Sequence, residues 1–215
     1  MISLEQAQNI TLNAQLLNQS NKSVLEVIRA HHHTLWSRCP NYKSKGLERL
    51  VKSRKIFEYW SHAAAFLPME DYKYSLFEKE RFKQKELSWF PKDQKVMDYV
   101  RDRIRAEGPL QSKDFKHKSH KSEGWFQAKP TKHALEKLFM EGALEISKRD
   151  GFQKVYDLTE NVIPRTAEKE IPHLNEYAEH LILKGIRAHG PITSAEAGYL
   201  RRGDIKKAIV LKVNE

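Results

Sequence analysis

Residues 104–115 read IRAEGPLQSKDF and residues 186–197 read IRAHGPITSAEA, so one short pattern occurs twice in the chain. In each copy a helical stretch runs into glycine and proline, which end a helix, and a residue that can cap the next helix follows. Thr193 and Glu196 have the spacing of a capping box, whereas Gln111 or Ser112 must cap in the first copy. Many winged-helix domains begin with a helix, a tight turn and a short capped helix. Two copies therefore predict at least two such domains in tandem.

The sequence around the first copy predicts a complete winged helix. A long amphipathic helix is expected over Asp93–Glu107, a short helix near Ser112–Phe115 and a third helix over Pro130–Met140. Two short alternating segments then predict a hairpin, with residues 148–152 as its turn, because Asp-Gly favours tight turns. The residues expected to face the core from the first helix are Val96, Tyr99, Val100 and Ile104.

The rest of the chain predicts two incomplete winged helices. The first predicted domain has helices and two strands, but the segment between them is short, and residues 31–42 within it are predicted to be irregular. The last predicted domain has its helices but no strands to form a wing. The predicted fold class is α+β, helix-rich, with tandem winged helix-turn-helix domains. The expected boundaries are a first winged helix lacking an internal strand (1–68), a helical connector (69–90), a complete second winged helix (91–160), a linker (161–171) and a truncated third winged helix (172–215).

The charge favours a polyanionic partner. The 215 residues contain 38 Lys and Arg against 28 Asp and Glu, a formal net charge of +10, and 10% of them are aromatic. This balance is typical of proteins that bind nucleic acid, although a basic protein without such a partner is the plain alternative. The single cysteine, Cys39, excludes an intrachain disulfide. With no long apolar run and no signal peptide in view, a cytoplasmic protein without membrane contact is expected, nucleoid-associated when it binds DNA.

The predicted DNA contacts lie on two elements of the second winged helix. In such a domain the third helix commonly enters the major groove, and the wing lies along the backbone. Lysine and arginine there would neutralise phosphates. The third helix and its approach carry Lys129, Lys132, His133 and Lys137. The wing carries Lys148, Arg149 and Lys154.

The histidine run His31-His32-His33 invites comparison with a metal site. Consecutive side chains in an irregular segment diverge, and no Cys or acidic residue stands nearby at ligand spacing. We therefore expect no metal and no cofactor. His32, His33 and Arg38 are instead predicted to contact DNA.

Several motifs resemble those of the bacterial crosslink-repair DNA glycosylases (AlkZ-like). The resemblance covers nearly the whole chain, and the Glu-Tyr-Trp-x-His-Ala stretch is its most specific part. The matching runs are 31–38 (HHHTLWSR), 57–64 (FEYWSHAA), 66–68 (FLP), 124–125 (GW), 129–130 (KP) and 155–159 (VYDLT). The resemblance implies tandem winged helices around a basic surface, double-stranded DNA as partner, intact or damaged, and metal-free hydrolysis of the N-glycosidic bond of alkylated bases.

The motif that this chemistry needs is missing. The family resembled here carries Gln–apolar–Asp or Gln–apolar–Gln on a strand shortly before the segment that matches 31–38, where the side chains activate water and stabilise the sugar cation. In this chain Arg29 and Ala30 run directly into His31, and Gln6-Ala7-Gln8 lies in an expected first helix. No catalytic residue is therefore assigned, and the chain is predicted to resemble a shortened member that lacks the catalytic strand and the C-terminal part.

Three functions follow in order of preference. The first is DNA binding by a protein related to monofunctional DNA glycosylases, without their activity. The second is an active glycosylase in alkylation or crosslink repair that uses another residue, such as Glu26 or Glu58. The third is a winged-helix transcription regulator, which two-fold symmetry would distinguish because regulators usually read paired half-sites. Oligomeric state and lesion preference are not readable from the sequence.

Overall fold

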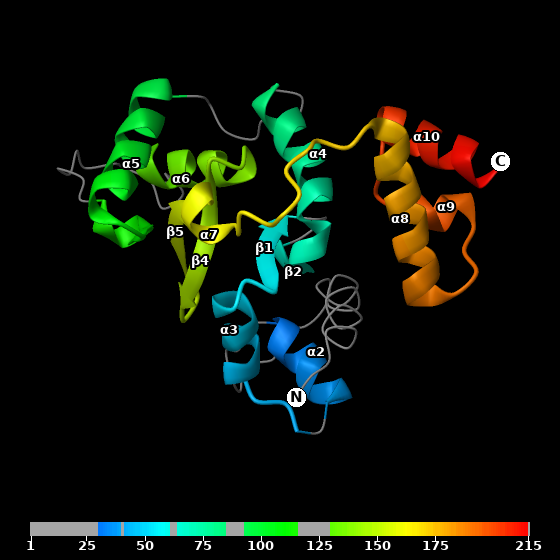
Figure 1. Cartoon of the computed structure of the whole chain (residues 1–215), viewed down its shortest axis with the longest axis horizontal. Helices are drawn as coiled ribbons and strands as arrows, with labels where there is room; N and C mark the ends of the chain where they lie inside the picture. Colours follow the sequence, from blue (N-terminus) through cyan, green and yellow to red (C-terminus); the bar gives the residue numbers. More distant parts are fainter. Residues whose placement is uncertain (1–29, 40, 61–63, 85–92, 116–129, 215) are drawn as a thin grey trace, which may run out of the picture. The chain divides into compact units, whose positions relative to one another are not determined.

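The structure is a computed structural model that describes residues 30–39, 41–60, 64–84, 93–115 and 130–214. It is α+β and helix-rich, as predicted, with two small sheets (Figure 1). The chain forms two compact units. Unit 1 comprises residues 1–44, 59–78 and 168–215, and unit 2 comprises residues 45–58 and 79–167. Strand β1 (Ile56–Trp60) and helix α4 (Tyr72–Lys83) each begin in one unit and end in the other.

Unit 2 is built around a three-stranded antiparallel sheet with the strand order β3-β5-β4. Its helices α5 and α6 pack against each other and against this sheet. The described elements of unit 2 are α3 (Lys45–Lys52), α5 (Gln94–Glu107), β3 (Leu110–Gln111), the 3₁₀ turn η2 (Ser112–Asp114), α6 (Pro130–Met140), β4 (Leu144–Asp150), β5 (Gln153–Leu158) and α7 (Thr159–Val162), together with the first part of β1 and the last part of α4.

The Gly-Pro turn of unit 2 forms as the sequence predicts. Asp93 caps α5 by accepting a hydrogen bond from the Val96 backbone N–H, and Gly108 follows the helix at φ +86°, a value that glycine adopts without strain. Gln111 and Asp114 then form a capping box around η2. Of the two candidate caps in the sequence, Gln111 is thus the one used.

One face of α5 differs from the prediction. Val100 and Ile104 are buried as expected, but Tyr99 is exposed and Met97 is buried in its place. Positions 97, 100 and 104 follow the 3.6-residue period, whereas position 99 lies off that stripe. Tyr99 packs edge-on against Phe115, with the Arg103 guanidinium near its ring.

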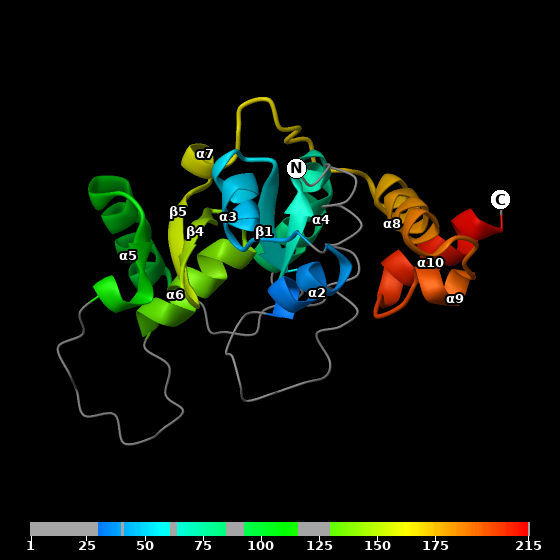
Figure 2. The same cartoon turned by 90° about the horizontal axis from the view of Figure 1, so that it is seen from below.

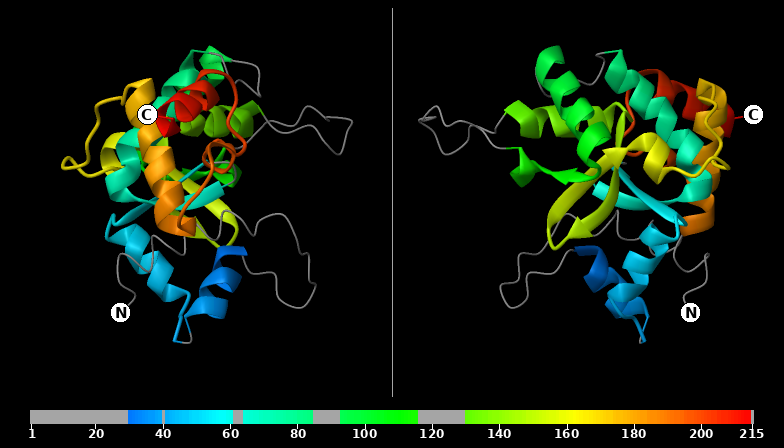
Figure 3. Two further views of the ribbon diagram at one scale, coloured as in Figure 1. Left: turned by 90° about the vertical axis from the view of Figure 1, so that its right-hand side faces the viewer. Right: turned by 60° about the vertical axis from the view of Figure 1, so that its left-hand side comes forward.

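The hairpin of unit 2 turns later than predicted. Strands β4 and β5 form a hairpin (Figure 3, right). Strand β4 continues to Asp150, so Lys148 and Arg149 lie within the strand, opposite Val155 and Lys154. Gly151, at φ +56°, and Phe152 make the turn. The Asp-Gly pair thus marks the turn itself, and the basic residues before it still pair with β5.

A lysine–glutamate pair is buried inside unit 2. The Lys79 Nζ of α4 donates to the Glu145 carboxylate of β4, and their side chains are 2% and 1% exposed. Burial lowers the pKa of Lys79, while the Glu145 charge and hydrogen bond oppose that shift. Gly142, which ends α6 at φ +75°, leaves room for the lysine stem, because a Cβ there would stand 2.7 Å from Lys79 Cδ.

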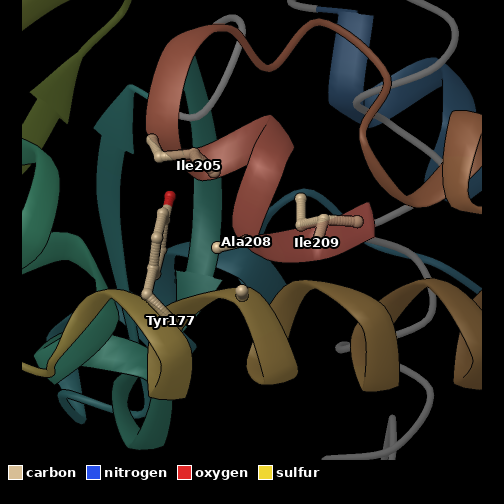
Figure 4. Packing of buried hydrophobic residues seen from close by; sticks show 5 residues of the cluster. Tyr177, Ile205, Ala208 and Ile209 are labelled. Carbon is tan, nitrogen blue, oxygen red and sulfur yellow. The ribbon is translucent and has the colours of Figure 1, made fainter. Parts of the chain in front are cut away.

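Unit 1 ends in three helices that share a core. The described elements of unit 1 are α2 (Ala30–Arg38), β2 (Ala64–Pro68), the 3₁₀ turn η1 (Met69–Asp71), α8 (Leu174–His189), α9 (Ser194–Ala197) and α10 (Gly203–Val213), with the end of β1, which pairs with β2, and the start of α4. Helices α8, α9 and α10 lie side by side (Figure 2). Tyr177, Ala178, Ile205, Ala208 and Ile209 interdigitate between α8 and α10 (Figure 4).

The second copy of the repeated pattern also behaves as predicted. Gly190 follows α8 at φ +78°, and Thr193 and Glu196 form the capping box of α9. In contrast, the prediction of an irregular segment over residues 31–42 is wrong, because residues 30–38 form helix α2. The helix ends just before Cys39 and Pro40, since the residue before a proline disfavours helical geometry. The order of elements in unit 2 is the one expected for a winged helix, while three winged helices in tandem with the predicted boundaries remain a prediction.

Candidate nucleic-acid interface

Helix α6 presents one exposed lysine at its start. Lys132 is exposed and His133 is half-buried, whereas Ala134, Leu135 and Leu138 face the core. Lys137 differs from the prediction: it is buried, and its Nζ lies 3.8 Å from Glu141 Oε1. Position 137 falls between the core positions 134 and 138 and so lies on the inner face. Lys129 lies outside the described residues.

The hairpin adds a second exposed lysine. Lys148 is exposed on β4, whereas Lys154 on β5 is half-buried with its Nζ 4.9 Å from the centre of the Phe139 ring. Asp150, next to the turn, accepts hydrogen bonds from Gln111 and Lys113, at 3.0 and 3.5 Å. The hydrogen bond from Gln111 is the larger cause, and the one from Lys113 the smaller, of a lowered pKa of the Asp150 carboxyl. Among the described candidates of unit 2, Lys132 and Lys148 are thus the exposed lysines.

Arg149 is engaged with a buried carboxylate. Its guanidinium donates two hydrogen bonds to the Glu58 carboxylate, one of them from Nε to Oε2 at 2.8 Å, and a third from Nη1 to the Phe152 carbonyl oxygen at 2.9 Å. Glu58 is 3% exposed. A fork of this kind fixes both side chains, because two parallel bonds constrain distance and angle together. The arginine predicted to contact DNA therefore has a structural partner from β1.

The candidate residues of α2 belong to unit 1. His32 Nδ1 lies 2.6 Å from the hydroxyl of Tyr42, so this histidine is held against a buried ring. His33 and Arg38 are exposed.

The described residues contain no cluster of three or more His, Cys, Asp or Glu side chains suited to hold a metal ion. Within the same residues no helix is both long and apolar enough to cross a bilayer.

One exposed residue on α2 is absent from the predicted contacts. Trp36 is 46% exposed, whereas Thr34 and Leu35 beside it are buried. The signal for it is the helical period of residues 30–38, which an irregular segment over 31–42 does not have.

A small cavity in unit 1 is lined by paired charges. Its volume is about 40 Å³, room for a few water molecules. Asp71 faces Lys184 with an Nζ–Oδ2 distance of 3.3 Å, and Glu78 faces Arg201 with an Nη1–Oε1 distance of 3.2 Å. The other lining residues are Tyr59, Trp60, Leu67, Tyr74, Ser75, Tyr177, His180 and Leu181. The pairing of the charges indicates that the cavity is part of the packing between α4 and α8.

His180 is the titratable group that should make unit 1 sensitive to acid. It stacks on Tyr74 with ring centres 3.6 Å apart. Burial lowers the pKa of His180 to about 4; Asp71 opposes that shift, and Lys184, Arg187 and Arg201 add to it.

The consequence for stability follows from proton uptake. In the unfolded chain the imidazole has a pKa of about 6.5, so unfolding takes up a proton between pH 6.5 and 4. We expect His180 alone to lower the free energy of unfolding by about 1–2 kcal/mol between pH 7 and pH 5. Urea denaturation at both pH values measures this loss. His180→Phe keeps a ring against Tyr74 but has no imidazole to protonate, so its loss of stability between pH 7 and pH 5 should be smaller by about 1–2 kcal/mol. Equal losses in the two proteins would contradict the assignment of this acid sensitivity to His180.

Comparison with known protein families yields a match. The model of the family described as DNA glycosylase AlkZ-like matches residues 13–213, which is nearly the whole chain. This match confirms the resemblance found in the sequence. No solved structure is similar enough to count as a match.

Proposed function

Because the chain belongs to the AlkZ-like DNA glycosylase family, we propose that it is a DNA-binding protein of DNA repair that does not excise bases. Membership supports a glycosylase-like role in repair, with DNA as the partner. The observation that carries the inactive state is the sequence of residues 19–30, which reads QSNKSVLEVIRA, runs directly into His31 and contains no Gln–apolar–Asp or Gln–apolar–Gln. General acid–base chemistry needs a group within hydrogen-bond reach of the attacking water.

The state of Glu58 supports the same proposal. An alternative catalytic carboxylate must reach water and substrate, yet Glu58 is 3% exposed and bonded to the Arg149 guanidinium. Glu26, the other carboxylate considered, lies outside the described residues. Of the two carboxylates considered, the one within the described residues is therefore held in an ion pair and shielded from water.

The proposed ligand is double-stranded DNA, bound through its backbone. The formal net charge is +10, and two exposed lysines of unit 2, Lys132 and Lys148, lie on the two elements that a winged helix uses for contact. The order α5, β3, η2, α6, β4, β5 supports a winged helix in unit 2. Phosphate contacts position a protein on DNA without reading sequence, so we expect little preference between sequences.

Salt is expected to weaken this binding steeply. Each phosphate that a lysine or arginine neutralises releases condensed counterions, and six or more such contacts cost roughly 10³-fold in affinity or more between 50 and 200 mM salt. Fluorescence anisotropy with two unrelated duplexes measures the slope. Affinity that changes little with salt, or differs greatly between the duplexes, would argue against backbone binding.

Paired variants test where the contact lies. The double variant Lys132→Ala with Lys148→Ala removes two proposed phosphate contacts, so the slope of log affinity against log salt concentration should fall by up to about two. The urea midpoint should stay unchanged, because both side chains are exposed. Lys113→Ala is the matched control, since its Nζ lies 3.5 Å from Asp150 Oδ2 and one cation is lost there too.

A further inference from the structure

We propose that Trp36 of α2 forms a stacking surface for an unpaired nucleobase of DNA, with Arg38 and Lys43 contacting the phosphates beside it. The inference rests on the proposed DNA binding and deepens it. It assigns a base contact to unit 1, whereas the lysine contacts proposed above lie in unit 2.

One side of helix α2 is buried in the protein, so the opposite side of the helix faces solvent. Thr34 and Leu35 are 4% and 5% exposed. The bond between His32 and the hydroxyl of Tyr42, itself 7% exposed, adds a polar anchor at 2.6 Å. The opposite positions of the same helix therefore stay in solvent.

The solvent side of α2 carries aromatic rings. Trp36 is 46% exposed, whereas Trp60, the other tryptophan among the described residues, is half-buried at the end of β1. His33 lies one turn earlier on the same face, with its ring 6.2 Å from the Trp36 ring and inclined by 72°. This edge-on contact supports the indole from the side and leaves its exposed part available.

The charge of the segment that contains Trp36 favours a nucleic acid over a protein partner. Residues 30–44 contain no Asp or Glu, and Arg38 and Lys43 in this stretch are exposed. The other exposed aromatic residues among the described ones each have a carboxylate within three positions: Tyr99 follows Asp98, Phe152 follows Asp150, and Tyr199 follows Glu196. An exposed ring in a segment whose charged side chains are all cationic suits an unpaired base, since the ring stacks on the base and the cations neutralise the phosphates.

A three-DNA comparison tests the proposal. The probes are a fully paired duplex, the same duplex with one unpaired nucleotide, and a single strand. The wild-type protein should prefer the two DNAs with unpaired bases, and Trp36→Ala should weaken binding to them roughly tenfold while changing duplex binding less than about twofold. Trp36→Phe should recover part of the loss. Tyr99→Ala, which removes another exposed ring, should leave the preference intact.

Tryptophan fluorescence gives a direct readout of stacking. The unpaired-base DNAs should quench the wild-type emission more than the duplex does, and this difference should vanish in Trp36→Phe. A tenfold loss on all three DNAs, or the same quenching in Trp36→Phe, would overturn the stacking role. A wild-type protein that binds duplex DNA without preference would overturn this inference alone. A wild-type protein that binds none of the three DNAs would overturn the proposed function as well.

Discussion

Glu145→Gln is expected to lower the free energy of unfolding by about 3–5 kcal/mol, because it leaves the buried ammonium of Lys79 without its carboxylate. The pKa of Lys79, already lowered by burial, should fall further once the opposing charge is gone. The folded variant then holds fewer protons than the unfolded chain, so its stability should rise with pH. Urea denaturation at pH 7 and pH 9 measures both the loss and its partial recovery.

The double variant Lys79→Met with Glu145→Leu separates charge from packing. Replacing both partners of a buried ion pair by apolar residues is often neutral or stabilising, so this protein should recover most of the loss. Asp150→Asn gives a surface control, since Asp150 is exposed and its loss should leave the urea midpoint nearly unchanged. A double variant as unstable as Glu145→Gln would show that the shape of the pair, and not its charge, holds the helix to the sheet.

Arg149→Ala is expected to cost about 2–4 kcal/mol of stability, because it removes the guanidinium that pairs with the buried Glu58 carboxylate. Lys148→Ala, its exposed neighbour on β4, should change stability by no more than about 0.5 kcal/mol. Combining Arg149→Ala with Glu58→Gln measures the coupling between the two side chains. Additive single losses, with no coupling, would mean that Arg149 stabilises the protein in another way and is free to contact DNA.

These ion pairs show what the sequence could not reveal. Glu58 and Arg149 are 91 positions apart, and Lys79 and Glu145 are 66 apart. Local patterns carry no information about such long-range partners, so Arg149 was assigned to DNA from its place beside a predicted turn. Contact between Arg149 and DNA stays a prediction. The loss of stability in Arg149→Ala must be measured before weaker DNA binding by that variant is attributed to a lost DNA contact.

Local signals predicted much of the fold. The Gly-Pro turns, the capping box of Thr193 and the bounds of α6 match the prediction because each depends on residues next to one another. Helix α2 is not predicted by the sequence, because three histidines have weak helix propensity and Pro40 favours a loop. Without that helix the exposure of Trp36 is not predicted either, since the exposed face of a residue depends on the helix that carries it. The prediction for Tyr99 is wrong for a related reason: aromatic character alone does not show on which face a residue lies.

The most direct test of the central proposal is base release from methylated and crosslinked DNA. The unmodified chain should bind these DNAs and release no base above background, even with protein in excess. A variant with a Gln–apolar–Asp strand inserted before His31 serves as the comparison. Robust turnover by the unmodified chain would contradict the account and would place an active catalytic group in a member of the family that lacks this motif.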